Sequence, residues 1–316
     1  MTALAAPRLV PDPSAFGAGE VTVARVGDVA IERGDVLPDV RIAYRHDGQP
    51  PPAPQIVLVH ALTGSADAAG DWWQPLIGPR RALDTDPYGV LCSNLLGGRY
   101  GSTGPTTIDP RKGRPYAAGF PDLTVRDQAR AMWQLLDELG IERLALVAGG
   151  SLGGMVALEV ALERPSEVDT VVPIAAPAAT GAMAIAWDHV QLALVRRLGV
   201  EGMALARQIA MITYRSDDDL DGRFGRAQAD DGAFAVASYL DHQAASSSTG
   251  STPRRIASSR APWTRTTWHA VGEASGPRCD ASRREAPGSW ASGSKGTSCT
   301  DRHRSATWSA RRGPPA

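Results

Sequence analysis

Ser151 is the residue whose type and neighbours most directly indicate chemistry in this chain. The apolar run LALVA is followed by Gly-Gly-Ser-Leu-Gly-Gly and then by further apolar residues. Glycines two residues before and after a serine, here Gly149 and Gly153, are typical of a sharp strand-to-helix turn, because a Cβ at either position would strike neighbouring backbone. Such a turn lifts the hydroxyl clear of the sheet, which predicts Ser151 as a nucleophile. The alternative is a glycine-rich connection in which Ser151 only caps the helix.

The same turn predicts a site that stabilises negative charge. The first N–H groups of a helix have no partner within it, so they point at an oxyanion that forms beside the serine. A serine also needs a histidine to accept its proton and a carboxylate to orient that histidine. In chains with this turn the aspartate, and then the histidine, follow the serine in sequence.

Apolar runs and helical patterns alternate through the part of the chain that must position Ser151. We expect strands over residues 21–31, 40–44, 56–59, 90–92, 144–147 and 168–174, and helices over 125–139 and 155–162. Strands that alternate with helices imply an α/β fold with a mostly parallel sheet. From 182 to 243 the pattern becomes helical, most clearly over 190–198 and 203–212. This segment is expected to cap the carboxyl ends of the strands, where such sheets place their sites.

The chain changes character after residue 243. Residues 1–20 are predicted to be a flexible N-terminus, 21–181 the core and 182–243 the cap. Residues 244–316 contain 12 Lys+Arg against 4 Asp+Glu and no Leu, Met, Phe or Tyr, yet they hold four of the eight tryptophans. Such a composition cannot build a core, so this basic tail is expected to be disordered. The last strands and helices of the fold are then missing or replaced, and the edge of the strand at 168–174 should be exposed.

Composition excludes several classes of protein. The 316 residues carry a net charge of −1, with no basic-then-apolar signal segment and no apolar run near the roughly 20 residues that span a bilayer. A soluble, cytoplasmic protein without a membrane partner is expected. The three cysteines, Cys92, Cys279 and Cys299, have no metal-ligand spacing, so neither a metal site nor a disulfide framework is indicated. Cys92 lies in an apolar strand and is expected to be a buried thiol.

Five segments together resemble the homoserine O-acetyltransferase family, and they occur in that family's order. They are His60-Ala61-Leu62-Thr63-Gly64, the glycine-rich stretch 97–105, the turn 149–154, Leu205-Ala206-Arg207 with Ile212-Thr213-Tyr214, and Ser238-Tyr239-Leu240-Asp241-His242-Gln243. The resemblance covers about residues 40–243. It implies an α/β-hydrolase fold, and acyl transfer from acetyl-CoA to the hydroxyl of L-homoserine, an early step towards methionine. Acetyl-CoA is then a co-substrate, with no bound cofactor; a homodimer is an open alternative.

The resemblance also assigns roles to particular residues. Ser151 matches the nucleophile that takes the acyl group, and the backbone N–H groups of Leu62 and Leu152 match the oxyanion hole. Arg207 matches the arginine that holds the substrate carboxylate, a task suited to a planar guanidinium that grips two oxygens. The alternative for Arg207 is an ordinary surface arginine of a helix.

Other residues near these segments have structural explanations. Asn94 and the glycines through Gly104 are expected to shape a loop beside the site, and Trp72 and Trp73 are expected to pack under the cap. Arg99 stands where many relatives have cysteine, and the cap between 194 and 202 is shorter than in many members. These departures leave open an acetyl or succinyl donor and the identity of the acceptor.

The triad aspartate and histidine are not identified in this chain. The family has the aspartate in a Ser-Asp-x-Leu-Tyr context and the histidine in a Gly-His-Asp context, and neither phrase is present. The tail offers only His269, His303, Asp280 and Asp301, and none of them follows a plausible strand. Without a scaffold these groups are not expected to act as base or acid.

A frameshift after Gln243 explains the tail economically. Codons permitted for the residues from Ala245 onward can be read in another frame as family-like sequence. The competing explanation, a basic tail for nucleic acid, lacks a recognisable binding module, so no nucleic-acid partner is expected. We therefore expect a homoserine O-acetyltransferase-like enzyme of small-molecule substrates that is impaired in this chain. The alternatives are an esterase or deacetylase, in which water accepts the acyl group, and a catalytically inactive remnant.

Overall fold

The structure of the chain is a computed structural model that describes residues 19–70, 73–98, 100–229 and 232–249. All the described residues belong to one compact unit. The predicted flexible N-terminus, up to residue 18, and the basic tail beyond residue 249 lie outside the described residues.

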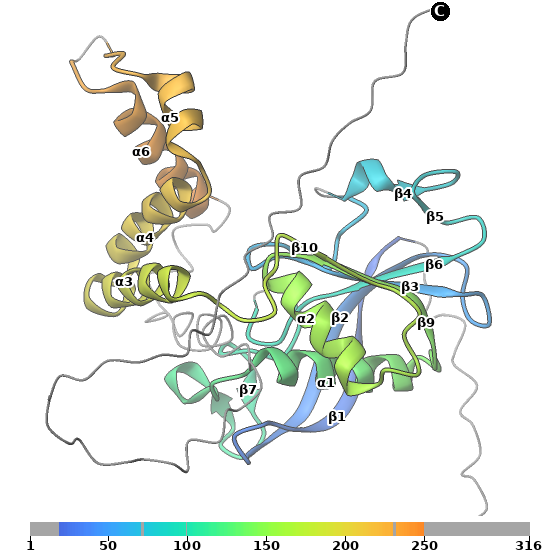
Figure 1. The fold of residues 1–316 in the computed structure, drawn as a ribbon. Helices are drawn as coiled ribbons and strands as arrows, with labels where there is room; N and C mark the ends of the chain where they lie inside the picture. The colour runs from blue at the N-terminus through green and yellow to red at the C-terminus, as the bar shows by residue number, and fades with distance from the viewer. Residues whose placement is uncertain (1–18, 71–72, 99, 230–231, 250–316) are drawn as a thin grey trace, which may run out of the picture. The chain divides into compact units, whose positions relative to one another are not determined.

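A six-stranded sheet forms the centre of the fold (Figure 1). Its strand order is β1 (Val21–Ala30), β2 (Val36–Gly48), β6 (Gly89–Ser93), β3 (Gln55–Val59), β9 (Leu144–Gly150) and β10 (Val171–Ile174). The pairs β6–β3, β3–β9 and β9–β10 are parallel, whereas β1–β2 and β2–β6 are antiparallel. The mostly parallel sheet predicted from the alternating pattern is therefore confirmed.

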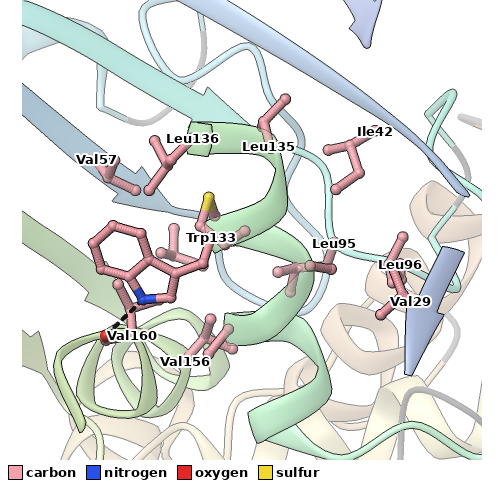
Figure 2. Packing of buried hydrophobic residues seen from close by; sticks show 14 of the residues in the cluster. Val29, Ile42, Val57, Leu95, Leu96, Trp133, Leu135, Leu136, Val156 and Val160 are labelled. Carbon is pink, nitrogen blue, oxygen red and sulfur yellow. Dashed lines mark hydrogen bonds between the residues drawn. The ribbon is translucent and has the colours of Figure 1, made fainter. Parts of the chain in front are cut away.

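Helices α1 (Val125–Glu138) and α2 (Leu152–Glu163) pack against one face of this sheet (Figure 1). Helix α1 starts at Thr124, whose hydroxyl accepts from the Asp127 N–H while the Asp127 carboxylate accepts from the Thr124 N–H. Figure 2 shows the apolar side chains between helices and sheet. In it, the indole N–H of Trp133 donates to the Val160 carbonyl at 2.9 Å, which ties α1 to α2.

The opposite face carries a smaller apolar cluster. Ile56 and Leu58 of β3 pack there with Trp73, Ile77 and Leu83. The covering segment contains η2 (Gln74–Leu76) and the short strands β4 (Ile77–Gly78) and β5 (Leu83–Asp84). Trp73 is therefore a packing residue, as predicted, but the predicted place under the cap is wrong, because its cluster contains no residue of 182–243. Trp72 lies outside the described residues.

Strand β10 ends the described sheet, and its apolar side chains are exposed. Val172 is 38% and Ile174 is 43% exposed. The strand is shorter than the predicted 168–174, and Val168 forms only an isolated bridge with Leu144. Within the described residues β10 pairs with β9 alone, so its outer edge is uncovered as expected.

The remaining elements include a helical segment and a small hairpin. The helices are α3 (Ala182–Leu198), α4 (Val200–Thr213), α5 (Asp217–Phe224) and α6 (Ala235–Thr249). The small hairpin is β7 (Ile108–Asp109) with β8 (Arg114–Pro115), followed by η3 (Ala117–Gly119). Helix α6 continues past position 243, where we placed the start of the tail, because Ala244 is buried and no helix breaker precedes Gly250. No described helix is long and apolar enough to cross a bilayer.

Candidate active site

Ser151 occupies a sharp turn between β9 and α2, as the glycine spacing predicted. Its backbone angles are φ 55° and ψ −123°, a region that non-glycine residues rarely adopt and that costs roughly 1–3 kcal/mol. Two hydrogen bonds hold the turn: the Ser151 N–H donates to the Ile174 carbonyl at 2.9 Å, and the Gly154 N–H donates to the Ser151 carbonyl at 2.9 Å. The residue is exposed, and its hydroxyl does not cap the helix. The structure therefore disfavours the capping alternative.

The flanking glycines are required by close backbone contacts. A Cβ built on Gly149 would lie 2.9 Å from the amide nitrogen of Gly154 and closer still to the carbonyl of Gly153. A Cβ built on Gly153 would lie 2.7 Å from the carbonyl oxygen of His60. The second contact shows that the turn touches the loop after β3. The expected backbone collision is thus confirmed at both positions.

Leu62 and Leu152, whose N–H groups the resemblance places in the oxyanion hole, lie on these two touching segments. The Leu152 side chain is 3% exposed within the main core cluster, and Leu62 packs against the same cluster. Both backbones are thereby held by their side chains. In the part of the chain that the structure describes, neither N–H donates a hydrogen bond. Two free donors beside a nucleophile are what an oxyanion hole requires.

His60 fixes the loop that carries Leu62, a role that our sequence interpretation missed. Its Nδ1 lies 2.7 Å from the Ala61 carbonyl, and its Nε2 accepts from the Leu95 N–H at 3.2 Å. Because Nε2 accepts, the proton is assigned to Nδ1 and the ring is neutral. Burial lowers the pKa of His60 below its usual value. With both ring nitrogens engaged, His60 positions the loop and is not a base for Ser151.

Asn94 shapes the neighbouring loop, as predicted. It is 3% exposed; its Oδ1 accepts from the Ala66 N–H at 2.5 Å and its Nδ2 donates to the Tyr100 carbonyl. The Ser102 hydroxyl donates to the Asn94 carbonyl at 2.8 Å. The loop also needs Gly97 and Gly101, whose φ angles are 81° and 99°. Arg99, the departure noted in this loop, lies outside the described residues.

Comparison with known proteins places this geometry in a family. A model described as the α/β hydrolase fold matches residues 54–230. The homoserine O-acetyltransferase of Moorella thermoacetica is 41% identical over 244 residues, which cover 67% of this chain and 65% of the relative. That of Nocardia farcinica is 38% identical over 272 residues, which cover 74% of this chain and 71% of the relative. The chain belongs to the homoserine O-acetyltransferase family.

The fold agrees with a solved member of the homoserine O-acetyltransferase family. The crystal structure of the Bacillus anthracis protein has a TM-score of 0.69 and 22% identity, and the match covers 80% of this chain and 75% of that one. This match confirms the α/β-hydrolase fold, and the sequence relatives confirm the family resemblance. The chain spans only about 65% of the M. thermoacetica relative's length.

Arg207, the proposed carboxylate ligand of a homoserine O-acetyltransferase-like site, lies on α4. It is half-buried, and its Nε is buried without a hydrogen-bond partner among the described residues. No described contact joins Arg207 to Ser151. The structure brings the turn at Ser151 against the loop that carries Leu62, through the close approach of Gly153 to His60, and Arg207 remains assigned only by the resemblance.

A base for Ser151 would be expected to be a histidine, and none that the structure describes is hydrogen-bonded to it. The Ser151 hydroxyl has no hydrogen bond to any described residue. Of the other described histidines, His46 is buried with Nε2 2.9 Å from the Gln55 Oε1, and burial lowers its pKa; His189 and His242 lie on α3 and α6. The four tail candidates, His269, His303, Asp280 and Asp301, lie outside the described residues.

The structure also bears on the cysteine and metal predictions. Cys92 is a free, buried thiol, and burial raises its pKa to about 12, so it is held in its unreactive protonated form. Cys279 and Cys299 lie outside the described residues. Among the residues that are described, no group of three or more His, Cys, Asp or Glu side chains could hold a metal ion.

Proposed function

We propose that this chain has the acyl-transfer site of a homoserine O-acetyltransferase, with Ser151 as nucleophile and acetyl-CoA and L-homoserine as small-molecule substrates. The single observation that carries the proposal is the exposed Ser151 in its strained turn, which is followed by the free N–H group of Leu152 and lies against the loop that leads to Leu62. Membership of the family supports it. Because the chain spans about 65% of a relative's length, the activity of the whole enzyme remains a proposal.

The proposed reaction has two steps, and both form or break a bond to the Ser151 Oγ. The Ser151 Oγ attacks the thioester carbonyl, the carbonyl oxygen becomes negative and the two N–H groups stabilise it. The C–S bond then breaks, coenzyme A leaves as a thiolate and an acetyl ester remains on Ser151. In the second step the homoserine hydroxyl attacks this ester, which forms O-acetylhomoserine and returns the serine. Arg207 would hold the homoserine carboxylate during this step.

Both steps need a group that takes a proton from the attacking hydroxyl, and no described residue is hydrogen-bonded to the Ser151 hydroxyl. We therefore propose that the chain as given is impaired. Serine enzymes lose several orders of magnitude in rate when the base is removed, because the other groups cannot replace its proton transfer. A frameshift after Gln243 would account for the loss, since the tail then replaces the segment that carries the acid and the base.

The first experiment asks which acyl chemistry remains. The chain and its Ser151→Ala variant are incubated with acetyl-CoA, with and without L-homoserine. Intact-protein mass spectrometry measures attachment of one acetyl group, and analysis of the small molecules measures O-acetylhomoserine and free acetate. We expect slow acetylation that depends on Ser151 and turnover near background. Formation of O-acetylhomoserine would identify a transferase, and release of free acetate would identify a hydrolase. A parent chain that forms no acetyl-serine would be an inactive remnant.

The second experiment tests the frameshift. The nucleotide sequence around the codon for Gln243 is determined, and a frame-restored chain is assayed beside the original with acetyl-CoA and homoserine. Restoration should give acetyl transfer that Ser151→Ala abolishes. Rapid Ser151-dependent turnover in the unshifted chain would contradict the proposed impairment, because it would require a base within the tail.

A further inference from the structure

Gln128 is a buried amide on α1 that pairs with the backbone of a loop. Its side chain is 6% exposed; the Oε1 accepts from the Leu96 N–H at 2.8 Å and the Nε2 donates to the Leu96 carbonyl at 3.0 Å. One amide thus satisfies both backbone groups of one residue, as a partner residue in an antiparallel pair of strands does. Leu96 lies in the loop after β6, and its side chain belongs to the main core cluster (Figure 2). Gln128 therefore fixes this loop relative to α1.

The loop after β6 in turn holds the loop after β3 at two points. The Leu95 N–H donates to the His60 Nε2 at 3.2 Å, and the Asn94 Oδ1 accepts from the Ala66 N–H at 2.5 Å. Leu62 lies between these two points, and its N–H donates no hydrogen bond in the part of the chain that the structure describes. The loop that carries this free N–H is thereby held on both sides of it.

The loop after β3 lies directly against the turn that carries Ser151. A Cβ built on Gly153 would lie 2.7 Å from the His60 carbonyl oxygen, so the two backbones are in close contact. Gly153 follows Ser151 by two residues, in the first turn of α2. A shift of His60 would therefore move the loop relative to the nucleophile. Donors of an oxyanion hole must lie about 2.7–3.1 Å from the oxygen that becomes negative, so even a small shift would weaken them.

We propose that Gln128 is a positioning residue for acyl transfer at Ser151. It acts through Leu96, Leu95 and His60, which together hold the loop after β3 against the nucleophile turn. This inference rests on the proposed function and adds to it a residue that touches neither the substrates nor the nucleophile. Both halves of the Gln128 amide are needed, because Leu96 presents one donor and one acceptor.

Two substitutions of Gln128 separate the amide's hydrogen bonds from its size. Gln128→Glu keeps the acceptor for the Leu96 N–H, but when ionised it repels the Leu96 carbonyl. When protonated it again has one donor and one acceptor. Burial favours the protonated form of a carboxyl group, so this variant should take up its proton at mildly acidic pH. Gln128→Met has a similar size and neither hydrogen-bonding group.

The rate at which acetyl-CoA acetylates Ser151 provides the test. Intact-protein mass spectrometry follows the reaction of the parent and the variants over a series of acetyl-CoA concentrations. At about pH 8 both Gln128 variants should lower the maximal rate about 10- to 100-fold, somewhat less than the loss of a whole oxyanion donor. The half-saturating concentration should stay unchanged, since Gln128 does not touch acetyl-CoA. At about pH 5 Gln128→Glu should recover to within about threefold of the parent, whereas Gln128→Met should not.

Gln134→Glu is the matched control, because Gln134 lies on the same helix and its Nε2 donates to the Asp28 carbonyl of β1 at 3.1 Å. The same change of amide to carboxyl should leave the acetylation rate equal to that of the parent at each pH. An equal slowing by Gln134→Glu, or a Gln128→Glu rate that does not recover in acid, would overturn the inference.

A merely structural role of Gln128 would give a different result. It would lower the fraction of the chain that becomes acetylated and leave the rate of the folded fraction unchanged, which would overturn the inference while the proposed function stands. A parent chain without Ser151-dependent acetylation would overturn the proposed function, and this inference with it.

Discussion

Gly149 lies directly against the backbone of Gly153, and Gly153 in turn lies against the backbone of Val59 and His60, so neither glycine can carry a side chain. A Cβ on Gly149 would overlap the Gly153 carbonyl and lie 2.9 Å from the next amide nitrogen. Both atoms belong to backbone that hydrogen bonds hold in place, so no side-chain rotation could relieve the clash. The orientation of Ser151 therefore depends on the absence of two Cβ atoms.

Gly149→Ala should destabilise the chain by about 3 kcal/mol, because the added methyl group displaces backbone in the core. Thermal or urea unfolding of the two chains measures the difference. Gly222→Ala is the control: Gly222 lies within α5, nothing lies within 4 Å of a Cβ built there, and alanine favours a helix by about 1 kcal/mol. Equal effects of the two substitutions would contradict the close contact.

Ser151→Gly should stabilise the fold while it removes the nucleophile. The φ of 55° is unfavourable for serine and ordinary for glycine, so relief of strain should outweigh the greater unfolded-state entropy of glycine by roughly 1 kcal/mol. A Tm about 2–4 °C above that of the parent is expected. Ser151→Ala, which keeps the Cβ, should show no comparable gain. A lower Tm for the glycine variant would mean that the serine conformation is not strained.

The outer edge of β10 should make the chain associate. The carbonyl groups of residues 170 and 174 accept hydrogen bonds from the β9 side. Because backbone groups alternate along a strand, the N–H and C=O groups of residues 171 and 173 point to the outer edge. Pro173 has no N–H to donate there. Association should then depend more on the exposed Val172 and Ile174 than on a new ladder of hydrogen bonds. Ile174→Lys should shift sedimentation profiles towards the monomer.

Leu76→Lys provides the comparison for this edge, because Leu76 is 42% exposed but lies in η2. It should leave the sedimentation profile unchanged. A parent chain that stays monomeric at all concentrations and melts in one cooperative transition would contradict an exposed, adhesive sheet edge.

Asp188 should make stability depend on pH in a defined window. Burial raises the pKa of Asp188 to about 6 from the ordinary value of 3.8, so between these values the folded chain binds the proton that the unfolded chain has released. Stability contributed by this group therefore falls as pH rises from about 4 to 6. Asp188→Asn removes this titrating group. The Tm of the variant minus that of the parent should therefore increase from about pH 4 to 6 and stay constant at higher pH.

The other charged side chains on the packed helices do not pair with Asp188 in the described residues. They are His189, Arg196 and Arg197 on α3 and Glu201 and Arg207 on α4. The control Glu201→Gln should show no such divergence from the parent. A difference between Asp188→Asn and the parent that is constant from pH 4 to 7 would mean that the carboxyl group titrates normally.

Local pattern was sufficient to predict the elements that carry the proposed nucleophile. The apolar runs predicted β3, β6 and β9 because both faces of these strands are buried, and the predicted helix at 125–139 ends where Gly140 adopts a φ of 68°. The turn at Ser151 was predictable because its geometry needs glycine at fixed offsets. These signals lie within a few residues of the structure that they specify.

The end of α6 at Thr249 was less predictable. Composition suggested a boundary at Gln243, but buried Ala244 extends the helix. The packing of Trp73 was expected, yet the sheet face on which it lies is set by strands distant in sequence. In both cases the contact that decides the outcome comes from another element.

The sequence by itself determined the strand-turn-helix at Ser151 and the α/β order of elements, because periodicity and glycine placement act locally. Only the tertiary structure decided that His60 is a neutral support, since its partner Leu95 is 35 residues away on another loop. It also decided that Asp188, Gln191 and Arg207 keep buried atoms without partners, because burial depends on how α3 packs on α4. Hydrogen bonding and desolvation are properties of neighbours in space, and a sequence specifies those neighbours only through the fold.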